Sequence, residues 1–155
     1  MSRAFVRDDV AEELERMPDR PISPRPNFVT QSGYAKIEQR LRELETTRTA
    51  AAAQDDRVEL PGIERDLRYW RQRRSSARIV PPPATPEIVR FGVTVRVRFD
   101  PGGEQSLRLV GEDEADPSIG LVSWASPVGS ALIGRCSGDV VSVAGRQAEI
   151  LDMHA

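Results

Sequence analysis

The chain has 155 residues and a formal charge of −2, and its 39% hydrophobic and 30% charged residues limit it to one or two small domains with a modest core. No apolar run approaches the roughly 20 residues that span a bilayer, and the first residues lack the apolar stretch of a signal peptide. Cys136 is the only cysteine, which excludes an internal disulfide and fits a reducing compartment. We therefore expect a cytoplasmic protein with no membrane partner.

Charge is distributed unevenly along the chain. Residues 30–80 carry eleven basic residues against eight acids, a net of +3, whereas residues 81–155 carry six against ten, a net of −4. A basic middle followed by an acidic end suggests different partners for the two parts. Cys136 has no suitable histidine partner because His154 lies at the end of the chain, so nucleophilic catalysis is unsupported, as are a zinc site and a P-loop.

Residues 1–29 have the composition of a disordered or extended tail. They combine acids and arginines with few large apolar residues and four prolines, at positions 18, 21, 24 and 26. A segment of this kind buries too little surface to offset the entropy of ordering it.

Residues 30–80 predict an antiparallel coiled-coil hairpin of two helices. Apolar or seam residues recur three and four apart in both halves, at Tyr34, Ile37, Leu41 and Leu44, and then at Ile63, Leu67, Trp70, Arg74 and Ala77. The polar turn between them, residues 54–61, contains Pro61. Neither helix can bury its stripe alone, so each needs the other, and the arms should be about 25–35 Å long.

A proline-rich linker, residues 81–86, separates the hairpin from a C-terminal domain over residues 87–155. In this domain Val93, Val95, Val97 and Phe99 alternate with polar residues, as in a strand with one buried face. Ser126-Pro127 is typical of a helix start, and Gly134 of its end. The predicted fold class is α+β, with the helical hairpin followed by a small antiparallel sheet that carries one short helix.

Two clusters of side chains suggest binding chemistry in the hairpin. Asp55, Asp56 and Glu59 lie in the turn, and carboxylates suit Mg²⁺, although acids also simply solvate many turns. The second helix is rich in arginine and carries Tyr69 and Trp70, residue types that pair with phosphates and stack on bases. The candidate nucleic-acid contacts are Arg68, Arg71 and Arg74; the alternative is a solvated helix face with Trp70 in the seam.

The C-terminal domain contains three blocks in a distinctive order: Val110-Gly111-Glu112-Asp113-Glu114-Ala115-Asp116, then Ser126-Pro127, then Ala131-Leu132-Ile133-Gly134 with Gly138-Asp139. This order closely resembles the C-terminal domain of the Gre family, the bacterial transcript-cleavage factors that bind RNA polymerase. The resemblance implies an FKBP-like fold for this domain, which would grip the rim of the polymerase secondary channel. The implied docking residues are Asp113, Glu114, Asp116, Ser126 and Pro127.

The resemblance also implies roles for the hairpin. In Gre factors the hairpin enters the secondary channel, a basic patch faces the nascent RNA, and a tip Asp and Glu, three apart, support a Mg²⁺ of the polymerase active site. Asp56 and Glu59 have that spacing, but Leu60-Pro61-Gly62-Ile63 then replaces the family's Asn-Ala-Glu-Tyr. Each arm is also shorter than in a cleavage factor by about two turns, which would withdraw the tip by about 12 Å. A hairpin of this length is closer to that of the Rnk-type relatives.

The sequence therefore predicts a transcription factor that binds RNA polymerase at the secondary channel and regulates elongation. We expect no intrinsic enzymatic activity, no small-molecule substrate and no cofactor beyond a Mg²⁺ shared in the polymerase active site. One alternative is full stimulation of transcript cleavage through Asp56 and Glu59. A second, from a different class, is an FKBP-like prolyl isomerase, although the only aromatic residues available for its pocket are Phe91, Phe99 and Trp124.

Overall fold

The computed structural model describes residues 9, 10, 12, 13 and 18–155, and the chain divides into two compact units. The hairpin unit contains the described residues up to Arg25 together with Ala35–Ala77. The sheet unit contains Pro26–Tyr34 and Arg78–Ala155. Among the described residues, no helix is both long enough and apolar enough to cross a membrane.

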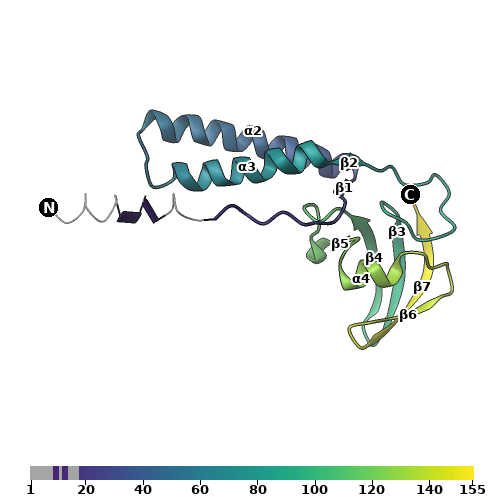
Figure 1. Cartoon of the computed structure of the whole chain (residues 1–155). Coiled ribbons are helices and arrows are strands. Elements are labelled where there is room, and N and C mark those ends of the chain that lie inside the picture. The colour runs from purple at the N-terminus through teal and green to yellow at the C-terminus, as the bar shows by residue number, and fades with distance from the viewer. Residues whose placement is uncertain (1–8, 11, 14–17) are drawn as a thin grey trace. The chain divides into compact units, whose positions relative to one another are not determined.

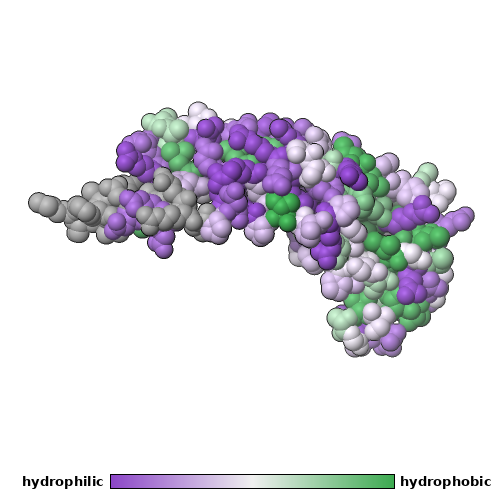
Figure 2. All heavy atoms as spheres, in the orientation of Figure 1, coloured by the Kyte–Doolittle hydropathy of each residue, from purple (hydrophilic) through white to green (hydrophobic). Residues whose placement is uncertain are grey.

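Two helices form the hairpin, α2 (Gln31–Ala53) and α3 (Leu60–Ser76), and they run antiparallel (Figure 1). They have 23 and 17 residues, which at the helical rise of about 1.5 Å per residue corresponds to about 35 and 26 Å. The predicted seam is confirmed in α2, where Ile37, Leu41 and Leu44 are buried, and in α3 at Leu67. The visible face of the hairpin is mostly hydrophilic, as expected for paired amphipathic helices (Figure 2).

The seam prediction is wrong for the second half of α3. Trp70 is only half-buried and Arg74 is exposed, whereas Arg73 is buried. Trp70 instead packs edge-on against Tyr69, with the ring centroids 5.1 Å apart. The heptad spacing alone therefore does not predict which side chains of this half of α3 are buried.

The larger sheet of the sheet unit has five strands, β3 (Thr94–Asp100), β4 (Gly103–Val110), β5 (Leu121–Ser123), β6 (Val140–Val143) and β7 (Arg146–His154), in the order β5-β4-β3-β7-β6. Strands β4, β3, β7 and β6 pair antiparallel as predicted, but β5 pairs parallel to β4. The short helix α4 (Pro127–Leu132) confirms the predicted helix in this domain. The α+β class is therefore confirmed, and the five-stranded sheet contains one parallel strand pair that the sequence did not indicate.

One face of the five-stranded sheet is buried in the apolar core. Val95, Val97 and Ile150 are fully buried, and Leu132 of α4 belongs to the same apolar cluster. The intervening residues of β3, such as Arg96 and Arg98, are exposed, so the alternation seen in the sequence separates the core from a polar outer face. Residues 81–86 contain no helix or strand.

Residues 26–29 correct the prediction of a tail that extends to residue 29. Phe28–Val29 form strand β1, which pairs parallel with β2 (Arg78–Ile79) inside the sheet unit. The Phe28 ring packs at a tilt against Phe91 and Trp124, with centroid distances of 6.0 and 5.2 Å. This segment is ordered because its apolar side chains meet partners that are distant in the sequence.

Candidate functional site

The hairpin tip, residues 54–59, is organised by Asp56. Its Oδ1 accepts the backbone N–H groups of Val58 and Glu59, each at 3.1 Å, and its carbonyl accepts the N–H of Leu60 at 3.2 Å. Asp56 thus caps the turn that leads into α3, because these donors have no helical partner of their own. The preceding residue, Asp55, has a positive φ of 48°, a conformation that Asp tolerates better than most residues.

The other tip acids form no metal site with the residues that the structure describes. Glu59 is exposed and makes no side-chain capping bond, and Asp55 lies 3.7 Å from Arg57 in a solvent-exposed ion pair. Within the described residues, no group of three or more His, Cys, Asp or Glu side chains is placed to hold a metal ion. Asp56 and Glu59 therefore do not fit a resident Mg²⁺, and a shared ion would need its other ligands from elsewhere.

In the acidic loop, residues 111–120, the buried acid is Glu114. It accepts hydrogen bonds from Thr30 Oγ1 at 2.5 Å and Ser32 Oγ at 2.7 Å, while Thr30 Oγ1 accepts the N–H of Gly33 at 2.9 Å. The carboxylate therefore lies at the N-terminus of α2, where the helix dipole favours negative charge. A Cβ at position 33 would lie 2.6 Å from Glu114 Oε2, which explains the glycine there.

This arrangement corrects the assignment of Glu114 to a docking surface. The residue is only 8% exposed, and its hydrogen bonds hold the start of α2 within the sheet unit. A buried carboxylate with two hydroxyl donors is a structural group, because its lone pairs already have partners.

The exposed part of the acidic loop lies at its C-terminal end. Asp116 caps the 3-10 helix η1 (Pro117–Ile119) by accepting from Ser118 N at 3.1 Å and Ser118 Oγ at 2.5 Å. Ile119 follows and is 67% exposed. Sequence reasoning missed Ile119; the available signal was a single large aliphatic residue in an otherwise acidic and polar loop.

The predicted helix start at Ser126-Pro127 is confirmed. Ser126 Oγ accepts the N–H of Gly129 at 3.1 Å and donates to the Ser123 carbonyl at 2.7 Å, and Pro127 occupies the first turn of α4. Of the five predicted docking residues, Asp116 and Pro127 are exposed, Asp113 and Ser126 are half-buried, and Glu114 is buried. Asp116 and Pro127, together with Ile119, therefore remain exposed and accessible to a partner.

The three predicted nucleic-acid contacts on α3 differ in their surroundings. Arg68 Nη2 lies 2.7 Å from Asp19 Oδ1, and Arg71 Nη2 lies 3.5 Å from Glu45 Oε1 on α2. Arg74 is exposed. Two of the three arginines are thus already paired with acids, in ion pairs that remain open to solvent.

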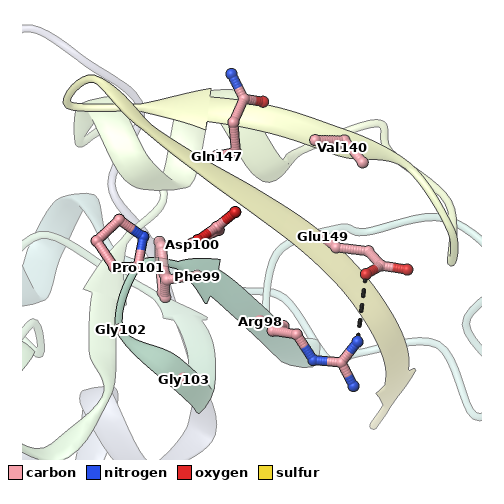
Figure 3. A pocket seen from close by; sticks show the side chains of 9 residues that line it. All are labelled: Arg98, Phe99, Asp100, Pro101, Gly102, Gly103, Val140, Gln147 and Glu149. Atoms are coloured by element: carbon pink, nitrogen blue, oxygen red, sulfur yellow. Dashed lines mark ion pairs between the residues drawn. The ribbon is translucent and has the colours of Figure 1, made fainter.

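A cavity of about 500 Å³ lies beside the β3–β4 turn of the sheet unit (Figure 3). Its lining includes Phe99, Pro101 and the exposed ion pair of Arg98 with Glu149, whose nearest N and O atoms are 3.5 Å apart. Phe91 and Trp124, the other aromatic candidates for an isomerase pocket, instead stack on Phe28. The dispersed aromatic residues argue against the isomerase alternative, since its pocket would need them together.

The outer face of the sheet carries a network of ion pairs. Arg96 Nη1 lies 3.0 Å from Glu104 and also bonds Asp152, and Arg98 Nη2 lies 3.0 Å from Glu104. The hydrogen bond from Arg96 lowers the pKa of Asp152, that from Arg98 lowers the pKa of Glu104, and Asp152 in turn raises the pKa of Arg96. All these groups are exposed, so solvent weakens the attraction between the charges of this network.

Comparison with known proteins finds relatives that are transcription elongation factors. A family model described as "Transcription elongation factor, GreA/GreB, C-term" matches residues 84–153. Transcription elongation factor GreA of Desulfovibrio desulfuricans is 36% identical over 135 residues, which cover 85% of this chain and 76% of the relative. GreB of Yersinia pestis is 33% identical over 136 residues, covering 76% and 80% of the two chains. Among solved structures, GreA factor homolog 1 (Gfh1) of Thermus thermophilus aligns with a TM-score of 0.41 and 22% identity, over 84% of this chain and 100% of that one.

Proposed function

We propose that this chain, which belongs to the GreA/GreB family of transcription elongation factors, binds RNA polymerase at its secondary channel and regulates elongation there. As a member of this family it is a transcription elongation factor rather than an enzyme. The observation that carries the proposal is the relationship to GreA along most of both chains, together with a family match that covers nearly all of the β3–β7 sheet. Such a factor acts in the cytoplasm, where the polymerase works.

The sheet unit supplies the docking surface in this proposal. Its exposed candidates, Asp116, Ile119 and Pro127, combine a carboxylate with apolar groups, and protein interfaces use both. Glu114 and Ser126 contribute indirectly, since they fix the start of α2 and the start of α4.

The hairpin modulates the polymerase without supplying a catalytic pair. The Asp56 Oδ1 atom is already used by two backbone N–H groups, whereas Glu59 presents an exposed carboxylate. The shortened arms predicted from the sequence support the same conclusion, because metal support tolerates only sub-ångström errors in ligand position. In this proposal, Arg68, Arg71 and Arg74 of α3 contact nascent RNA phosphates.

A pull-down with bacterial core RNA polymerase tests the proposal. We expect the full chain to retain the polymerase at micromolar concentration, and Ile119→Ser to weaken retention by about tenfold, as for removal of a central apolar contact. Val140→Ser is the matched control, because Val140 is 58% exposed on β6, at the opposite edge of the sheet from β5. No retention of polymerase by the unmodified chain at micromolar concentration would overturn the proposal.

A further inference from the structure

The α3 surface around Tyr69 and Trp70 has the chemistry of a platform for single-stranded nucleic acid. The two rings meet edge to face at 5.1 Å, and Arg68 precedes them in the sequence. Aromatic faces accept bases by stacking, and a guanidinium beside them accepts a phosphate. We call Arg68, Tyr69 and Trp70 the stacking platform.

The stacking platform is occupied by the chain's own N-terminal segment, residues 18–25. The guanidinium carbon of Arg20 lies 3.8 Å from the centroid of the Tyr69 ring and 5.7 Å from that of Trp70. Asp19 Oδ1 accepts from Arg68 Nε at 2.8 Å and lies 2.7 Å from Arg68 Nη2. Both contacts lie within the hairpin unit, alongside α3 (Figure 1).

Two consecutive residues thus present what one nucleotide would present. Asp19 places an anion on Arg68, where a phosphate would bind, and Arg20 places a flat, delocalised group over Tyr69, where a base would stack. An additional ion pair between Arg20 Nη1 and Asp66 Oδ1, at 3.2 Å, fixes the guanidinium over the rings. We propose that Asp19 and Arg20 are an intramolecular competitor that single-stranded RNA must displace from the stacking platform.

The contacts suit a reversible competitor. The side chains of Asp19 and Arg68 are 65% and 54% exposed, so their attraction is weakened by water and by salt. Arg20, at 34% exposure, is the better anchored of the two, because it stacks and pairs at once. The inference rests on the proposed contact with nascent RNA, and it adds that this contact is gated by residues of the same chain.

The test measures binding of the full chain to a fluorescein-labelled single-stranded oligoribonucleotide by fluorescence anisotropy at low salt. Asp19→Ala combined with Arg20→Ala leaves the net charge unchanged, so a gain in affinity cannot come from long-range attraction. We expect this double variant to bind about three- to tenfold more tightly than the unmodified chain. The matched control is Arg40→Ala combined with Glu43→Ala, which removes an exposed, charge-neutral pair on α2 and should leave the affinity unchanged.

Adding Arg68→Ala to the double variant should abolish the gain, because the phosphate contact is then absent. If the double variant binds no more tightly than the unmodified chain while Arg68→Ala alone weakens binding, the platform binds RNA without a competitor and the inference is overturned. If no variant binds RNA, the inference is also overturned. The polymerase pull-down with the full chain instead tests the docking surface of the sheet unit, so its result separates the failure of this inference from a failure of the proposed function.

Discussion

The hairpin tip and the acidic loop both gather acids in a turn, and the structure uses them in different ways. At the tip, Asp56 caps a helix start from an exposed turn, and its neighbours Asp55 and Glu59 face solvent. In the acidic loop, Glu114 is buried against the first turn of α2 and bonded to two hydroxyls. Two turns of similar local charge density therefore have different structural roles, an exposed cap and a buried anchor. Burial and hydrogen-bond partners distinguish the two roles.

The largest effect is expected from the buried acid. Glu114→Ala removes the carboxylate that accepts hydrogen bonds from the hydroxyls of Thr30 and Ser32. We therefore expect a loss of about 3 kcal/mol in the free energy of unfolding. Urea titration followed by circular dichroism measures the loss. Glu87→Ala, at an exposed position of the same unit, is the control and should change stability by less than about 0.5 kcal/mol. Equal losses for the two variants would show that Glu114 is not a structural anchor.

A smaller effect is expected at the tip. Asp56→Ala removes a cap from two backbone N–H groups and should cost about 1 kcal/mol of hairpin stability, measured in the same titration. Glu59→Ala is the matched control three residues away, and we expect no measurable cost because its side chain makes no capping bond.

The opposite result at the tip would restore the cleavage alternative. If Asp56 supported a polymerase metal, the unmodified chain would release short 3′ RNA fragments from a backtracked elongation complex, and Asp56→Ala would stop this release without lowering stability. We expect no stimulated release from either protein, since the Asp56 carboxylate is already engaged within its own turn.

The sequence predicted those features that depend on neighbours in the chain. Alternation of Val95, Val97 and Phe99 revealed β3, and Ser126-Pro127 revealed α4, because strand period and capping chemistry are local. Local patterns could not reveal the Thr30–Glu114 bond, whose partners are 84 residues apart, nor the pairing of Asp19 with Arg68. The pairing of β1 with β2 was missed for the same reason, since two-residue strands have no period to detect. An FKBP-like fold for the sheet unit stays a prediction.

The smallest effect on stability is expected from the exposed ion-pair network on the outer face of the sheet, in contrast with the effect of buried Glu114. Arg96 and Arg98 hold the pKa values of Asp152 and Glu104 below their usual range, so these acids stabilise the folded state above their unfolded pKa values. That contribution is lost in the acidic range, as the pH falls through the lowered pKa values. The raised pKa of Arg96 has no influence in this range, because arginine stays protonated throughout. In chemical unfolding at pH 7 and at about pH 3, the unmodified chain should therefore lose more stability on acidification than Glu104→Gln combined with Asp152→Asn. Equal losses of stability in the two proteins would show that other carboxylates cause the acid sensitivity and that the ion-pair network does not stabilise the fold.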